Sequence, residues 1–140
     1  MKKNKLITGL LILGFFLTFN SCNWNKPNEE EVNQIETVDN EISDEIIDEL
    51  TKEYGITSID KTVDYDHSIT YSFSFPKDIN VTIIRIGVVA IFNKLGYDIS
   101  AIWEIDVDGT HFTEHIYKNV KLTLRIDPQT NMFCLKISKK

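Results

Sequence analysis

Residues 120–137, VKLTLRIDPQTNMFCLKI, decide the fold class of this chain. Apolar and polar side chains alternate through residues 120–126 and again through residues 133–137, and a period of two is typical of strands with one buried face. The intervening segment 127–131, DPQTN, is rich in residues that favour turns. The stretch therefore predicts an antiparallel hairpin at the end of the chain.

The residues before this hairpin predict further strands. Residues 99–107 and 111–118 have strand-like patterns, and the Asp-Gly dipeptide between them is favoured in two-residue hairpin turns. Residues 69–75 alternate aromatic or aliphatic side chains with Ser and Thr. We expect them to pair with residues 59–65 across a short polar turn.

A helical period replaces this alternation nearer the N-terminus. Three isoleucines and a leucine recur at helical spacing across residues 42–50, with acids on the other side, which predicts an amphipathic helix. Residues 32–38 continue the pattern less regularly. Asn40 or Ser43 is expected to cap the start of this helix, and Gly55 is placed to end it.

Residues 78–95 fit two interpretations. Their many β-branched side chains suit strands. Apolar residues nevertheless recur every three to four positions, and the ending NKLG, 93–96, is typical of a helix that stops before a glycine. We predict a buried central helix, with strands as the alternative. Arg85 and Lys94 are expected to extend outward from it.

The order of helix, two strands, helix and four strands predicts an α+β fold. We expect an antiparallel sheet of about five to six strands, packed on one face by the central helix, with an N-terminal amphipathic helix. The predicted organisation is a signal peptide at 1–21, an acidic tether at 22–40 and a single domain at 41–140.

The first 22 residues have the organisation of a secretory signal, with lysines followed by the apolar run LITGLLILGFFLTF at 6–19. Phe19-Asn20-Ser21-Cys22 resembles the lipobox of bacterial lipoproteins, and Asn20 differs from the usual small or aliphatic residue there. The resemblance implies cleavage before Cys22 and attachment of lipid to it. Asn23, in place of an Asp that would favour the inner membrane, implies the outer membrane. Secretion without a lipid is an alternative; a spanning helix needs roughly 20 apolar residues, more than this run contains.

The charge of the chain is concentrated in one segment. Residues 1–21 carry three lysines and no acids, so the 15 bases and 21 acids of the chain leave a net charge of −9 from residue 22 on. Ten of the acids lie in residues 28–50, which contain no Lys or Arg. We interpret this segment as a solvated spacer, with a sorting or docking signal as the alternative. Acidity and the lack of a basic, aromatic-rich cluster argue against nucleic-acid binding.

The stretch EIDVDGTHFTEH, 104–115, resembles a metal-binding loop. Three acids alternate before a glycine as in an EF-hand calcium loop, but the twelfth position is His115 rather than Glu. On a strand His111 and His115 would lie roughly 13 Å apart, too far to share one zinc ion. We expect a structural hairpin with no metal or cofactor. Asp106, Asp108 and His111 form the candidate polar site if the alternative, a metal-dependent or enzymatic module, holds.

Several side chains are expected in the core rather than at a site. Cys134 lies in a strand-like stretch without cationic neighbours, which predicts a buried, unreactive thiol. With Cys22 bearing lipid, it has no disulfide partner. Tyr71, Trp103 and Tyr117 are predicted to pack inside, with an exposed sheet face that recognises another protein as the alternative.

The sequence contains no nucleophile elbow, phosphate loop or zinc-protease helix. It therefore predicts a non-catalytic envelope lipoprotein, joined to the membrane through lipid on Cys22, whose α+β domain binds another macromolecule. A protein partner is expected, and an inhibitor or immunity-type protein is one version of this prediction. The alternatives are the metal-dependent or enzymatic module at Asp106–His115 and a purely structural component of the envelope.

Overall fold

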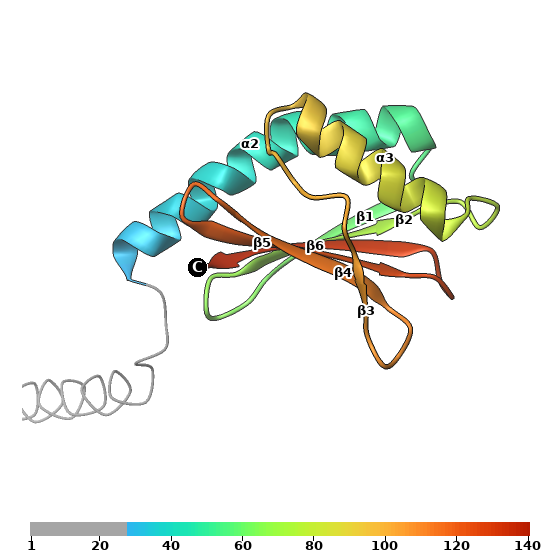
Figure 1. Cartoon of the computed structure of the whole chain (residues 1–140). Coiled ribbons are helices and arrows are strands. Elements are labelled where there is room, and N and C mark those ends of the chain that lie inside the picture. The colour runs from blue at the N-terminus through green and yellow to red at the C-terminus, as the bar shows by residue number, and fades with distance from the viewer. Residues whose placement is uncertain (1–27) are drawn as a thin grey trace, which may run out of the picture.

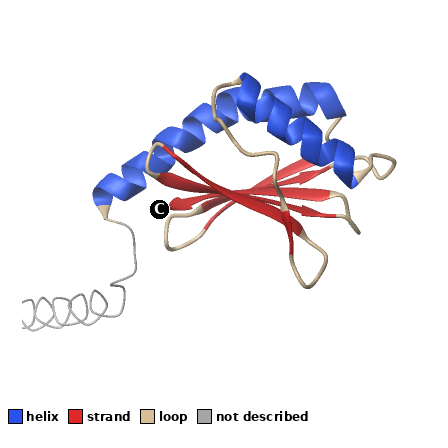
Figure 2. Cartoon of the chain, viewed as in Figure 1, coloured by secondary structure: helices blue, strands red, loops and turns tan. Residues whose placement is uncertain are grey.

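The structure is a computed structural model that describes residues 28–140. It has the α+β architecture predicted from the sequence, with a six-stranded antiparallel sheet and two helices on one of its faces (Figures 1 and 2). The predicted signal peptide and Cys22 lie outside the described residues. The elements follow in the order α2 (Glu29–Tyr54), β1 (Ser58–Val63), β2 (Ile69–Ser74), α3 (Val81–Lys94), β3 (Glu104–Ile105), β4 (His111–Tyr117), β5 (Val120–Asp127) and β6 (Met132–Lys139).

The strands lie in the order β1-β2-β6-β5-β4-β3, so the last strand of the chain occupies the middle of the sheet. The hairpin predicted from residues 120–137 is confirmed, with Leu124 opposite Leu135 and Ile126 opposite Phe133. The first hairpin is also confirmed, with Phe73 of β2 opposite Ile59 of β1. Alternate residues of the central strands are fully buried beneath the helices, which is the period-two pattern of a sheet with one covered face.

Helix α2 begins at the Asn28 cap, whose Oδ1 accepts a hydrogen bond from the Glu31 N–H at 2.9 Å. Three glutamates occupy its first turn, where the helix dipole favours negative charge. Ile35 and Val38 are buried and extend the apolar face of the helix toward its start. The caps predicted at Asn40 or Ser43 are therefore wrong, as is the tether at 22–40 for its residues 29–40. The predicted end at Gly55 is confirmed, with φ of 61°.

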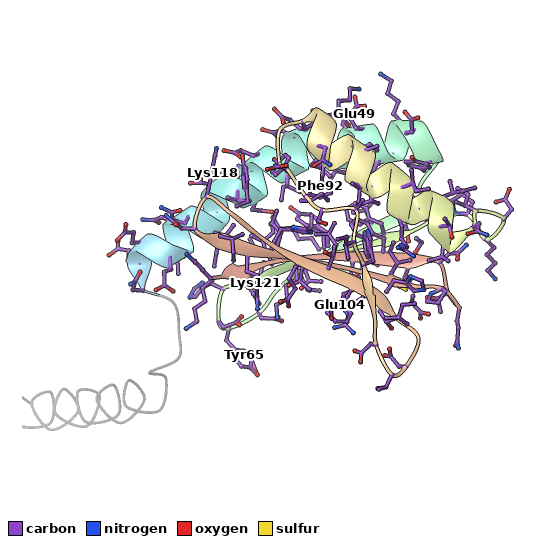
Figure 3. All side chains as sticks on the ribbon, viewed as in Figure 1. Glu49, Tyr65, Phe92, Glu104, Lys118 and Lys121 are labelled. Carbon is purple, nitrogen blue, oxygen red and sulfur yellow. The ribbon has the colours of Figure 1, made fainter. Side chains whose placement is uncertain are left out.

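The helix predicted in residues 78–95 is confirmed as α3. Asn80 caps it by accepting a hydrogen bond from the Thr82 N–H at 2.7 Å. Ile84, Val88 and Phe92 are fully buried, so tertiary burial outweighs the strand preference of the β-branched residues. Phe92 is labelled between this helix and the sheet in Figure 3.

The strand predicted at 99–107 is wrong except for β3. The segment leaves the end of α3 and runs past the edge of the sheet toward β3 (Figure 1). The Ile99 N–H and C=O are bonded by the side chain of Asn93 at 2.6 Å and 3.0 Å rather than by a neighbouring strand. Ile99 and Trp103 still insert into the core. The segment is therefore irregular and is held to the core by these two side chains, although its sequence resembles that of a strand.

Candidate functional site

Asp106 and Asp108, the acids of the predicted polar site, bind backbone groups of the β3–β4 turn, and Asp106 also binds a side chain of β5. Asp106 accepts a hydrogen bond from the Val107 N–H at 2.8 Å and forms an ion pair with Arg125 at 3.4 Å. Asp108 accepts from the Thr110 N–H at 2.9 Å, and this backbone hydrogen bond lowers the pKa of the Asp108 carboxyl. Both carboxylates therefore stabilise the β3–β4 turn, as a structural hairpin requires.

His111, the third residue of that predicted site, does not join the two acids. It pairs in register with Ile126, whose side chain is in the core, so it lies on the helix-covered side of the sheet. Its Nδ1 lies 3.3 Å from Nη1 of Arg85 on α3. Glu114 pairs with Thr123 on the other face and cannot act with His111. Within residues 28–140, no three His, Cys, Asp or Glu side chains gather as a metal site would require.

A cavity of about 430 Å³ lies between α3 and the segment that leads to β3. Its helix side is one face of α3, because the five contributing residues recur at helical spacing. We call it the Arg85 cavity. It is lined by Thr82, Arg85, Ile86, Val89, Ala90, Ala101 and Trp103.

Arg85 was expected to extend into solvent, and this prediction is wrong. Its side chain is half-buried, with its guanidinium carbon 5.9 Å from the centre of the Trp103 ring. Within the described part of the chain, no carboxylate lies within 4.0 Å of this guanidinium. Its Nε–H is buried and has no hydrogen-bond partner among residues 28–140.

Trp103 forms another wall of the cavity and is itself 8% exposed. Its indole Nε1–H is likewise buried without a partner in the described structure. Unpartnered buried donors are uncommon in folded proteins because each loses its bond to water without replacement. Two of the side chains that line the Arg85 cavity therefore each carry a buried donor without a partner among the described residues. One local signal of this cavity is present in the sequence, an arginine in VTIIRIGVVAIFNK, 81–94, which has no acidic residue.

Three isoleucines, on α3, on the segment after it and on β3, expose much of their surface. Ile86 of α3 is 65% exposed, Ile102 is 76% exposed and Ile105 of β3 is 65% exposed. Each is near the cavity. Ile86 lines it, Ile102 lies in sequence between the lining residues Ala101 and Trp103, and Ile105 pairs with His111, the partner of Arg85. We call these three residues the isoleucine patch.

The opposite face of the sheet is not covered by a helix (Figure 2). It is mainly polar, and its charges are partly paired, with Lys121 3.8 Å from Glu114. Lys121 is labelled on this side, away from the helices, in Figure 3. Cys134 is half-buried there, with Sγ 3.6 Å from the Ser72 hydroxyl, so the prediction of a buried thiol is wrong. Of the predicted core aromatics, Tyr71 and Trp103 are buried and Tyr117 is partly buried.

A buried charge fixes α2 to the sheet. Asp39 is 6% exposed and accepts hydrogen bonds from Lys61 of β1 at 2.7 Å and from the Tyr71 hydroxyl of β2 at 2.5 Å. The hydrogen bond to Asp39 raises the pKa of Lys61. This set of contacts is structural, because both acceptor oxygens are occupied by residues of the protein itself.

His115 also lies on the helix side of β4, with Nε2 2.9 Å from the Thr113 hydroxyl. Burial lowers the pKa of His115, and the charge of Asp98 opposes this shift. The imidazole of His115 therefore takes up a proton less readily than a solvent-exposed histidine does.

The chain matches no family model, no curated protein and no solved structure. Among residues 28–140, neither helix has the combination of length and apolar character needed to cross a bilayer. What the protein does must therefore be inferred from the geometry of its own side chains.

Proposed function

We propose that this protein is a lipoprotein of the bacterial envelope, held in the membrane by lipid on Cys22, whose domain binds a protein partner without catalysis. The isoleucine patch is the observation that carries the proposal. Large aliphatic side chains on a small domain normally contribute to the core, and a group of them left in solvent is typical of a protein-binding surface.

The patch is presented by a firmly held backbone. Ile102 follows a segment whose Ile99 is bonded by Asn93, and it directly precedes the buried Trp103. Ile86 is on α3, which is packed against the core. Little conformational entropy is then lost when a partner covers these side chains, which favours tight binding.

The start of α2 at Glu29 supports a short connection to the membrane. From Cys22 to Asn28 a fully extended chain reaches roughly 20 Å. A lipid on Cys22 would keep the acidic helix, and with it the domain, near the membrane surface. The partner is therefore expected in the envelope, as a membrane protein or a soluble protein that reaches the membrane.

Affinity purification of the full chain from its native membranes tests this proposal. Ile102→Lys should reduce recovery of a stoichiometric partner by roughly tenfold or more, because docking would bury an unpaired charge. Val63→Lys is the matched control, since Val63 is also an exposed aliphatic residue but lies on β1, at the opposite edge of the sheet. It should leave recovery unchanged.

The lipid anchor is tested separately with Cys22→Ser. This variant should leave the membrane fraction while keeping its affinity for the purified partner, because the patch is far from the anchor in sequence. No stoichiometric partner, or equal losses with Ile102→Lys and Val63→Lys, would contradict the binding proposal. Retention of the Cys22→Ser variant in membranes would contradict the anchor.

A further inference from the structure

We propose that the Arg85 cavity is a binding site for a small amphipathic anion, with a carboxylate on Arg85 and an apolar body between Ile86 and Trp103. This inference goes beyond the protein partner proposed above and does not depend on it. It rests on the charge, the donors and the shape of the cavity.

The charge of the cavity is uncompensated. A guanidinium stays protonated at all physiological pH values and has five N–H donors but no acceptor. Helix α3 contains no acidic residue, and no ion pair to Arg85 forms within residues 28–140. A half-buried cation without a counter-charge is unfavourable, and a bound anion would supply that counter-charge.

The neighbour of Arg85 also leaves the positive charge in place. His111 Nδ1 lies 3.3 Å from Arg85 Nη1, and because arginine only donates, Nδ1 accepts. The contact orients the guanidinium and brings no negative charge to it. Arg85 Nε–H is buried and has no partner among residues 28–140, so the hydrogen bonding of the guanidinium is incomplete.

Trp103 also lines the cavity, and its buried Nε1–H has no partner among residues 28–140. The guanidinium carbon of Arg85 lies 5.9 Å from the centre of the Trp103 ring, so the ring already holds the guanidinium in place without a ligand. A carboxylate, with two acceptor oxygens, matches the paired N–H donors of a guanidinium.

The remaining walls select an apolar body. Ile86, Val89, Ala90 and Ala101 supply aliphatic surface, and the volume of about 430 Å³ is within the range of small-molecule sites. A sugar or a polyphosphate would leave most of its polar groups facing these side chains. One negative group on a hydrocarbon or aromatic body fits the lining best.

Isothermal titration calorimetry of the full chain with 2-naphthoate tests the site, with 2-naphthamide as the uncharged probe of the same shape. Naphthoate should bind saturably with one site per chain. The amide should bind at least tenfold more weakly, because it lacks the charge that Arg85 recognises.

Two variants test whether the probes bind in the Arg85 cavity. Arg85→Gln should weaken naphthoate binding at least tenfold and reduce the difference between the two probes. Ala101→Leu narrows the cavity while keeping Arg85, and it should weaken both probes alike. Arg125→Gln is the control, since Arg125 also lies beside an aromatic ring but faces the uncovered side of the sheet. It should bind as the unmodified chain does.

Thermal unfolding of each variant verifies that it is folded, and Ala101→Leu keeps the proposal testable if Arg85→Gln does not fold. Equal binding of naphthoate and naphthamide, unsaturable binding, or unchanged binding in Ala101→Leu would overturn the proposal. These results do not involve the protein partner, so either proposal can fail while the other stands.

Discussion

Gly87→Ala tests the closest contact between the two helices. A Cβ at Gly87 would lie 1.8 Å from Oη of Tyr54 and 2.3 Å from its Cζ, whereas carbon atoms normally approach to roughly 3.5–4.0 Å. The Tyr54 ring, whose centre lies 5.7 Å from that of Phe75, must therefore move. α3 can cross the last turn of α2 here only because position 87 has no side chain.

The size of the effect follows from two opposing terms. Overpacking of this kind costs about 1–3 kcal/mol, and replacing a helical glycine with alanine returns about 1 kcal/mol. The difference between these terms predicts that Gly87→Ala lowers the free energy of unfolding by up to about 2 kcal/mol. In a Tyr54→Ala background the clash is absent, so the same change should stabilise the protein by up to about 1 kcal/mol.

Urea unfolding followed by far-UV circular dichroism measures both values in a double-mutant cycle. Tyr54→Phe is a matched control, because it removes Oη but leaves the ring carbon that lies at 2.3 Å. Most of the destabilisation should persist in that background. A Gly87→Ala effect of the same sign and size with Tyr54 and with Ala at position 54 would refute the contact.

Three further predictions concern the buried polar groups. Asn131 has φ of 53° and donates to two backbone carbonyls before α3, so Asn131→Ala should cost about 2–4 kcal/mol and Asn131→Gly roughly 1 kcal/mol less, measured by urea unfolding. Lys61→Met leaves the Asp39 carboxylate buried with only one donor and should cost about 1–3 kcal/mol in the same assay. Burial lowers the pKa of His115, so below pH 6.5 the unfolded chain takes up a proton that the folded chain excludes. Stability should therefore fall between pH 7 and 5, and His115→Gln should show a smaller fall in thermal unfolding measured against pH.

Each of these has a result that would contradict it. Equal stabilities of Asn131→Gly and Asn131→Ala would show that the left-handed backbone is not strained by a side chain. A neutral Lys61→Met would mean that Asp39 does not need its cationic partner. A pH dependence unchanged in His115→Gln would assign the loss of stability in acid to other groups.

The fold could be predicted largely because periodicity is a direct consequence of burial. Residues 120–137 alternate since one face of β5 and β6 packs under the helices. α3 could be predicted despite its β-branched content, because the spacing of its buried residues outweighs propensity. Both features depend on local sequence, which is where pattern reasoning is strongest.

The errors arose where a pattern had a second cause. In residues 99–103 Ile99 and Trp103 anchor an irregular segment, and Ala101 between them is exposed, so its apolar side chain completes an alternation that burial does not follow. The many acids of residues 29–40 favour a spacer and hide the start of α2, although Asn28 and the glutamates after it are good N-terminal residues for a helix.

The candidate site could not be predicted because it depends on tertiary contacts. Asp106 and Asp108 are near His111 in sequence, but the alternation of β4 turns His111 toward α3. Arg85 and Trp103 are separated in sequence and meet only when the segment after α3 folds back. A lone arginine in an apolar helix was the only local signal, and it fits an exposed residue equally well.

The most direct test of the proposed function is photo-crosslinking in the native envelope, with a photoreactive residue at Ile102 of the full lipidated chain and, separately, at Val63. The account predicts one discrete adduct of the same protein partner from position 102 and none from position 63, because these residues lie toward opposite edges of the sheet. No adduct at position 102, or the same products from both positions, would contradict a partner-binding surface at the isoleucine patch.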